Sequence, residues 1–523
     1  MESYLNRALA RERQTRESIT NLSLAFHLNR RPQGTTSSTV NNNAALADGS
    51  PQRVQQQRSR CRDAMIQDWC TCLGQEFTKV ASLTVSICYP QEEQAIKTLP
   101  IKALAIFCLL RNKTLKTIEF CHGVCWTGSR DEFIHASHHL SRLSGLQTIS
   151  LNCPWQMQVR DYFVVHAGVL VEEQPPTTTA AEAMDILLQG LNQVDSLKFL
   201  RITGGPPDFR SIRHAEDGDD EEEESPLVQL CRGSGGSSRV NFELRLVDCT
   251  PMMSNRLLQS ICSSGESHDS STSRLVKLTL VNCLSHDTNI QELARVLRNN
   301  QSLRELLISF SEPPPDNCCL NVPAVIGMLE MLEHNQTLKK LNLDAKCFPL
   351  DLDAGDTWIQ IEDTMARIIY LKTLTLYFHG YSERCNLNVP TLVLRALRQN
   401  QVLIKLDITI HWTGSEEQQR AFEPLYVDEC NEQLELALAT NKSLQVVELS
   451  VMSPEWELTT IPLNKNIQFF LKMNRIGRKS LDQDPLDRRL WTDTLIEQKD
   501  DTALSFHLLS TNIAVFSPLL VAA

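Results

Sequence analysis

The chain has 523 residues, enough for several compact domains or one long repeat array. With 42% hydrophobic residues it can bury a large core. Its formal net charge of -12 argues against a protein that binds nucleic acid through bulk positive charge, so we expect no nucleic-acid partner.

The N-terminal segment differs in composition from the rest of the chain. Residues 1–62 hold ten arginines, no lysine and four acidic residues, a charge of +6, which leaves -18 for the remainder. Residues 2–29 could form one basic helix, although charged residues interrupt its apolar face. Residues 31–60 are rich in Asn, Gln, Ser and Thr, which is typical of disorder. We predict that residues 1–60 form a basic, largely disordered arm with a helix near its start.

No segment has the features of a secretory signal or a membrane span. Arg7, Arg11 and Arg13 occupy positions where a secretory signal would have its apolar core. The longest mainly apolar runs, 103–110 and 513–523, are too short to cross a bilayer. The 17 cysteines, an odd number, are typical of reduced thiols. We therefore expect an intracellular protein without a membrane span, cytoplasmic or alternatively nuclear.

A strand pattern recurs eleven times along the chain. Its clearest copy, residues 275–283, reads L-x-x-L-x-L-x-x-C, and most copies start 28 to 35 residues apart. We call each copy a strand frame and number its positions from its first residue. The eleven frames begin at Val80, Leu115, Leu146, Leu197, Asn241, Leu275, Leu303, Leu338, Leu371, Leu403 and Leu444.

Segments with helical periodicity separate the strand frames, and several of them end in the sequence N-x-[ST]-L, as at 300–303 and 335–338. Asparagine tolerates the left-handed backbone conformation that ends many helices, so we interpret these sequences as turns rather than glycosylation sites. One unit is then a helix, an asparagine turn and a short strand. Such units close a core only by stacking on their neighbours.

This unit resembles the leucine-rich repeat of the ribonuclease-inhibitor-like type, which also forms the tails of NOD-like receptors. Residues 464–478 are similar to the terminal segments of leucine-rich-repeat families expanded in diatoms and other protists. The resemblance covers roughly residues 67–451. It implies an α/β leucine-rich-repeat solenoid, a horseshoe of about eleven repeats, with a parallel sheet on its concave side and helices on its convex side.

The solenoid is expected over residues 61–475. Within it, an acidic run at 216–224 and a Gly/Ser stretch at 233–238 predict a loop insertion over 204–238. Because a repeat array must shield its ends from water, we predict that residues 476–523 form a C-terminal cap.

The sequence contains no recognisable enzyme motif, so we expect a non-catalytic protein with no catalytic residues and no cofactor. One cluster has the residue types of a zinc site: Cys121 and Cys125 are followed by His135 and His139 at helical spacing. The repeat explains these positions without a metal, since Cys121 ends a strand and His135 lies on the next helix. Zinc is therefore the weaker of the two interpretations.

The strongest candidate for a functional surface is the concave face of the sheet, because the third, fifth and seventh residues of each frame point away from the core. Five basic and six acidic residues are mixed there, which suits a protein partner better than a phosphate backbone. The predicted partner-binding residues are Glu119, Phe199, Arg201, Glu243, Arg245, Lys277, Glu305, Lys340, Asn342, Asp344, Tyr377, Lys405, Asp407 and Glu448.

These observations predict a non-catalytic scaffold that binds partner proteins through the concave face of the sheet. Two alternatives remain open. One is a regulator of a small GTPase, because the Ran GTPase-activating proteins have similar repeats and an acidic segment. The other is a ubiquitin-ligase substrate adaptor, similar to F-box leucine-rich-repeat proteins. The sequence specifies neither the partner nor the oligomeric state.

Overall fold

The structure is a computed structural model in which the chain divides into two compact units. The first unit comprises residues 1–261 and 265–283, and the second comprises residues 262–264 and 284–523. The structure describes residues 21–27, 81–88, 97–100, 104, 115–120, 124–152, 180–204, 225–232, 241–247, 249, 274–283, 287–309, 322–344, 355–381, 388–412, 415–453, 457–475, 496, 502, 505 and 506.

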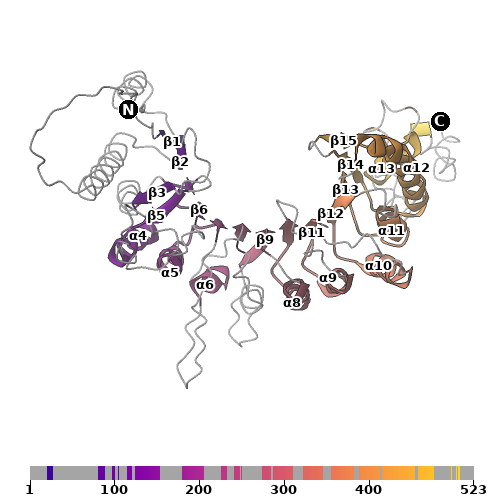
Figure 1. Ribbon diagram of the computed structural model, residues 1–523. Coiled ribbons are helices and arrows are strands. Elements are labelled where there is room, and N and C mark those ends of the chain that lie inside the picture. Colours follow the sequence, from indigo (N-terminus) through magenta and orange to yellow (C-terminus); the bar gives the residue numbers. More distant parts are fainter. Residues whose placement is uncertain are drawn as a thin grey trace, which may run out of the picture. The chain divides into compact units, whose positions relative to one another are not determined.

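The first unit is built on a parallel sheet with the strand order β1-β2-β4-β6-β7-β8-β9. Successive strands run in the same direction (Figure 1). Two further strands, β3 (Lys97–Pro100) and β5 (Val124–Thr127), form a separate parallel pair. The strands of the main sheet are β1 (Asn21–His27), β2 (Ser82–Cys88), β4 (Thr117–Phe120), β6 (Thr148–Asn152), β7 (Phe199–Thr203), β8 (Phe242–Val247) and β9 (Leu275–Val281).

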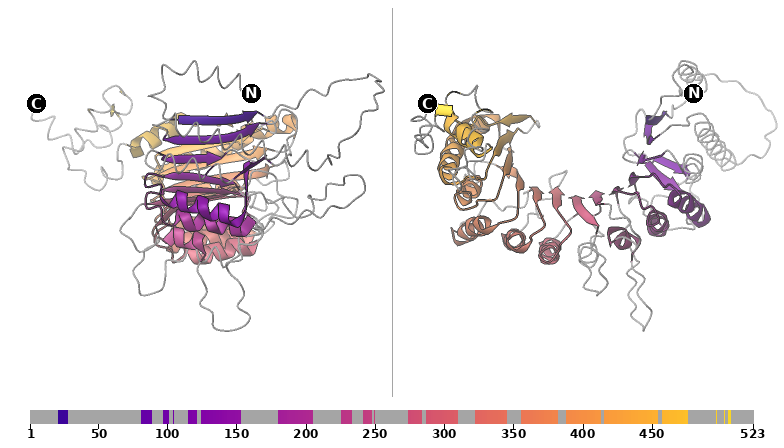
Figure 2. Two further views of the ribbon diagram at one scale, coloured as in Figure 1. Left: turned by 90° about the vertical axis from the view of Figure 1, so that its left-hand side faces the viewer. Right: turned by 180° about the vertical axis from the view of Figure 1, so that it is seen from behind.

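The helices of this unit, α4 (Arg130–Ser141), α5 (Ala180–Leu191) and α6 (Pro226–Arg232), lie along one side of the sheet (Figure 2). Helix α4 begins with a capping box, in which the side chains of Ser129 and Glu132 each accept a hydrogen bond from the other residue's backbone N–H. Helices α4 and α5 approach closely because Gly190 has no side chain to meet Ser137. The parallel strands and flanking helices confirm the predicted α/β class.

The second unit repeats the arrangement. Strands β10 to β14 are parallel, and the short β15 pairs antiparallel with β14. The helices again lie on one side of the sheet (Figure 2). The elements in chain order are α8 (Asp287–Leu297), β10 (Glu305–Ser309), α9 (Val322–His334), β11 (Lys340–Asp344), α10 (Gly355–Arg367), β12 (Thr373–Tyr381), α11 (Asn388–Ala396), β13 (Lys405–Trp412), α12 (Glu416–Thr440), β14 (Val446–Met452), β15 (Leu458–Thr460) and α13 (Lys465–Arg475).

Each of the eleven predicted strand frames contains a strand of the structure. Where side chains are described, the fourth and sixth residues of a frame are buried, as Leu278 and Leu280 are at 0% exposure. They belong to the core on the helix side of the sheet. The recurring alternation of strand and helix is compatible with a repeat solenoid.

The helix predicted over residues 2–29 is wrong for its last part, because residues 21–27 form strand β1. Its apolar residues alternate at Leu22, Leu24 and Phe26, a period of two that suits a strand. In the register with β2, Leu22 lies opposite Leu83 and Leu24 opposite Val85. The remaining residues of the predicted arm lie outside the described part of the chain.

The loop insertion predicted over 204–238 is corrected in a similar way. Residues 226–232 form helix α6, in which Leu227 and Leu230 are fully buried and supply the helix of a repeat unit. The acidic run 216–224 and the Gly/Ser stretch lie outside the described residues. So does the predicted C-terminal cap, apart from residues 496, 502, 505 and 506.

The asparagine turns of the second unit do not use a left-handed backbone. At Asn441, which follows α12, φ is -76° and ψ is 120°, an extended conformation. Among the described non-glycine residues, only Asn282 has a positive φ. The predicted reason for asparagine at these turns is therefore wrong, although the turns themselves are present.

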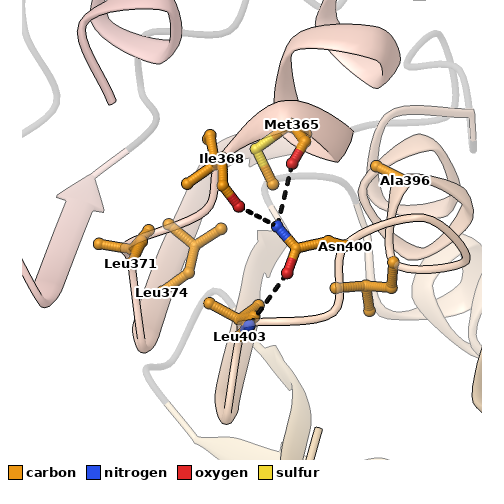
Figure 3. Close-up of a pocket in the computed structure, with 8 residues that line it drawn as sticks. Met365, Ile368, Leu371, Leu374, Ala396, Asn400 and Leu403 are labelled. Carbon is orange, nitrogen blue, oxygen red and sulfur yellow. Dashed lines mark hydrogen bonds between the residues drawn. The ribbon is translucent and has the colours of Figure 1, made fainter. Parts of the chain in front are cut away.

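The side chain of Asn400 shows what the residue does instead (Figure 3). Its Oδ1 accepts hydrogen bonds from the backbone N–H groups of Val402 and Leu403 at 3.1 and 2.9 Å. Its Nδ2 donates to the carbonyls of Met365 and Ile368 in the preceding turn, at 3.2 and 2.8 Å. The amide thus holds its own turn closed and also links it to the preceding repeat of the same unit.

Asn335 and Asn441 make the same two-sided set of contacts, and Asn474 donates to the backbone of the turn before it. All three are buried. The asparagine of these turns is therefore a buried hydrogen-bonded junction between neighbouring repeats, since a buried polar group needs such partners. Asn335 and Asn441 stand in the N-x-[ST]-L sequence, whereas Asn400 and Asn474 make junction contacts without it. Burial also makes these asparagines unsuitable for glycosylation in the folded protein.

Candidate functional site

The predicted partner-binding residues lie on strands of both units, on the side of the sheet opposite the core. We call this side the strand face. In the first unit it includes Glu119, Phe199, Arg201, Glu243, Arg245 and Lys277. In the second unit it includes Glu305, Lys340, Asn342, Asp344, Tyr377, Lys405, Asp407 and Glu448. For Asp344 the structure describes only the backbone.

Six of these charged residues form three ion pairs between adjacent strands. Lys340 Nζ lies 2.7 Å from Glu305 Oε1, and Lys405 Nζ lies 3.0 Å from Glu448 Oε1. The third pair joins Lys277 to Glu243 at 3.4 Å. These pairs remain partly exposed, so part of the mixed charge predicted for the strand face is neutralised within the surface itself.

An arginine pair on the strand face of the first unit is different. Arg201 on β7 lies directly opposite Arg245 on β8. The Nε atom of each is buried and has no hydrogen-bond partner in the described part of the chain. Burial lowers the pKa of the Arg245 guanidinium, and the charge of Arg201 lowers it further. Two positively charged side chains therefore lie next to each other on the strand face.

The register surrounds this arginine pair with hydroxyl groups. Ser150 on β6 lies opposite Arg201, and Thr279 on β9 lies opposite Arg245. Ser150 and Thr203 are each 5% exposed, and their hydroxyl oxygens also lack a hydrogen-bond partner among the described residues. The sequence analysis did not select Ser150, Thr203 or Thr279, although all three stand at odd positions of their frames.

An acidic pair occupies the strand face of the second unit, where Asp407 on β13 lies opposite Glu448 on β14. Burial raises the pKa of the Asp407 carboxyl and the charge of Glu448 raises it further, while nearby Lys405 lowers it. Because Lys405 also binds Glu448, this pair has a cation within hydrogen-bonding distance. Its charge is partly balanced from within the unit.

The candidate zinc ligands are only partly visible. His135 and His139 lie on α4, with their Nε2 atoms 3.1 Å apart, which is a hydrogen bond between the rings. Burial lowers the pKa of His139, and the neighbouring His135, His138 and Arg142 lower it further. Cys121 lies outside the described residues, and Cys125 is described only as backbone of β5. No group of three or more potential ligands clusters among the side chains that the structure describes.

A small hollow lies beside the Asn400 turn (Figure 3). Its wall is apolar apart from Asn400, whose amide is already hydrogen-bonded on both sides. The hollow therefore offers a ligand no free polar group and is part of the core between two neighbouring repeats of the second unit. It is lined by Met365, Ile368, Leu371, Leu374, Ala396, Leu397, Asn400 and Leu403.

None of the described helices combines the length and the apolar character needed to cross a membrane. In comparisons with known proteins, no family model matches the chain and no curated protein matches it.

Proposed function

We propose that the chain is a leucine-rich-repeat solenoid of the ribonuclease-inhibitor-like type, with about eleven repeats in a horseshoe. We propose further that it is a non-catalytic scaffold whose concave strand face binds a partner protein. The observation that supports this function most is the charge pattern of the strand face. The first unit carries an arginine pair and the second an acidic pair that Lys405 balances only in part, and each unit also carries an ion pair between adjacent strands.

A protein partner fits this pattern for a physical reason. Charges that are already paired on the surface contribute little to binding, whereas incompletely balanced charges favour a partner of complementary charge. A surface with both signs does not suit the uniform negative charge of a nucleic-acid backbone. Extended sheet surfaces are also the usual binding surfaces of repeat proteins.

The GTPase-regulator and ubiquitin-adaptor alternatives have no comparable support. The acidic run that suggested the first lies outside the described residues. Both make distinct predictions, because a GTPase regulator would stimulate GTP hydrolysis and an adaptor would copurify with a Skp-type protein.

The function is tested by affinity capture from native lysate with two matched triple variants. The first reverses three ion-paired lysines of the strand face, Lys277→Glu, Lys340→Glu and Lys405→Glu, so that each balanced ion pair becomes two unbalanced negative charges. The control reverses three ion-paired arginines of the helices, and its substitutions are Arg295→Glu, Arg367→Glu and Arg420→Glu. Both variants carry the same change in net charge.

We expect the strand-face variant to lose partners that the intact chain and the helix variant retain, as measured by quantitative mass spectrometry. All three proteins must melt at similar temperatures for the comparison to count. Equal partner sets for the two variants would contradict binding through the strand face. Loss of the same partners from both variants would point to net charge rather than to a specific surface.

A further inference from the structure

The arginine pair creates an electrostatic problem that the described residues do not solve. Neighbouring strands of a sheet lie only about 4.8 Å apart, so side chains directly opposite each other on one face are close neighbours. Arg201 and Arg245 are opposite each other on β7 and β8. Neither guanidinium appears in an ion pair with a described acidic residue, unlike the three strand-face lysines.

The nearest acidic residue on the same strand cannot balance them fully. Glu243 stands two residues before Arg245 on β8, and its carboxylate already pairs with Lys277 at 3.4 Å. The positive charge of the arginine pair therefore exceeds the negative charge that the described residues around it supply. An outside anion would remove this repulsion.

Four unsatisfied hydrogen-bonding groups gather at the same place. They are the Nε atoms of Arg201 and Arg245 and the hydroxyl groups of Ser150 and Thr203, all buried and without a partner in the described residues. Ser150 lies opposite Arg201, and Thr203 follows Arg201 by two residues on the same face. Buried polar groups nearly always have a partner in native proteins. A cluster of four on three adjacent strands thus has the composition of a binding site for a group rich in hydrogen-bond acceptors.

We propose that Arg201 and Arg245, with the hydroxyl groups of Ser150 and Thr203, bind the phosphate group of a phosphorylated side chain in the partner protein. This inference depends on the proposed function, because it assigns the partner's anion to the strand face. A phosphate monoester carries a charge of about -1.5 to -2 and three acceptor oxygens at neutral pH. It matches two guanidinium forks and two hydroxyl donors, whereas a carboxylate has one charge and two oxygens.

The first test measures binding of a small probe, N-acetyl-O-phosphoserine methylamide, to the full chain by its effect on the melting temperature and by titration calorimetry. The corresponding serine and aspartate compounds and inorganic phosphate serve as comparison probes. The site variant carries Arg201→Gln and Arg245→Gln. The control variant, Arg130→Gln, removes an exposed positive charge from helix α4 of the same unit and leaves the strand face unchanged.

We expect the phosphoserine probe to bind the intact chain and the control variant, and to bind the site variant about tenfold more weakly or not at all. If the double substitution unfolds the chain, Arg245→Lys keeps the charge without the planar fork and should still weaken binding. Absence of binding to the intact chain, or equal binding to the site variant, would overturn the proposal. Inorganic phosphate binding as tightly as the phosphoserine probe would indicate a free-anion site and would also overturn it.

The second test separates this inference from the proposed function. Affinity capture is repeated after the lysate is treated with a phosphatase. Partners lost both after phosphatase treatment and in the site variant would support a phosphorylated partner. Partners that persist after phosphatase treatment but are lost in the strand-face lysine variant would leave the scaffold function standing and reject the phosphate site. If no partner depends on the strand face at all, the proposed function fails whatever the probe does.

Discussion

The two faces of each sheet differ in how much their residues vary from strand to strand. On the core side, every described side chain at the fourth or sixth frame position is Ile, Leu or Val and is at most 7% exposed. On the strand face, the fifth position changes from Ser150 through Arg201 and Arg245 to Thr279 across four strands of the first unit. Burial restricts one face to a few apolar shapes, whereas the other is free to carry binding chemistry.

This difference predicts opposite responses to the same kind of substitution. Removing a side chain from the core side should leave a cavity that the neighbouring units cannot fill. Removing one from the strand face should mainly change the surface that a partner meets. Four predictions test that contrast, beginning with the largest expected effect on stability.

Leu278→Ala and Leu341→Ala remove core side chains that are 0% and 1% exposed, one in each unit. Each substitution should lower the free energy of unfolding by about 2–5 kcal/mol, because it combines lost burial with a residual cavity. Urea melts followed by circular dichroism measure the loss. A loss below about 1 kcal/mol at both positions would mean that the core side has been wrongly assigned.

Asn441→Ala tests whether a buried polar side chain contributes as much to stability as a core leucine does. The substitution leaves the N–H groups of Ser443 and Leu444 and the carbonyls of Leu397 and Asn400 without their partner. We expect a loss of about 2–4 kcal/mol, since buried groups left unsatisfied each cost about 1–3 kcal/mol and part of this cost is relieved by water.

The control for this prediction is Asn466→Ala on α13, where an exposed asparagine binds only the Glu435 carboxylate. It should cost well under about 1 kcal/mol. In the first unit, Leu143 and Val194 stand three residues before a frame, where the second unit has Asn300, Asn335, Asn400 and Asn441, and both are at most 2% exposed. Equal losses for Asn441→Ala and Asn466→Ala would show that the amide junction is replaceable by water.

The regular spacing of apolar residues on the core side of the strands explains how much of the fold could be predicted from sequence. Apolar residues that alternate with period two, and recur in each repeat, predict a strand without any knowledge of the neighbouring strands. All eleven strand frames could therefore be located from the sequence. Strand β1 was missed although Ile19, Leu22 and Leu24 stand at the first, fourth and sixth positions of a further frame. The spacing of Ile19, Leu22 and Phe26, which also fits one face of a helix, favoured a helix instead.

The strand face could be predicted only as a set of residues and not as a set of contacts. Frame positions alone would place Glu243 opposite Lys277, as third residues of successive frames, and Arg201 opposite Arg245, as fifth residues. They do not specify which of these side chains form bonds. The Lys405–Glu448 ion pair, for example, joins a third residue to the fifth residue of the next frame. The asparagine turns were located correctly, but their side-chain bonds depend on the preceding unit.

Asp185 lies on α5, on the helix side of the sheet. We expect its carboxyl group to make the stability of the protein depend on pH. Burial raises its pKa from 3.8 to about 6, and its Oδ1 has no hydrogen-bond partner among the described residues. Because the folded state holds the proton more tightly, its contribution to stability should be present below pH 4 and be lost as the pH rises through about 6.

Asp185→Asn should therefore stabilise the protein at pH 7 by about 1 kcal/mol, a value reduced because the side chain retains contact with solvent. It should also flatten the dependence of stability on pH between 4 and 6. Chemical melts at several pH values measure both effects, with exposed Asp131→Asn on α4 as the control. A lower stability of Asp185→Asn at pH 7 would contradict the assignment of a half-buried carboxylate whose Oδ1 has no partner among the described residues.

Lys277→Ala and Lys340→Ala should have the smallest effect, lowering the free energy of unfolding by less than about 1 kcal/mol each. Each substitution removes one ion pair, and that pair is partly exposed and screened by salt. A double-mutant cycle with Glu243→Ala or Glu305→Ala measures the coupling directly, and raising the salt concentration should reduce it. Coupling as large as the loss from Leu278→Ala would mean that these ion pairs help to hold the strands in register. In that case the strand face would be a structural surface as well as a binding surface, and the variants used to test partner binding would need to preserve its ion pairs.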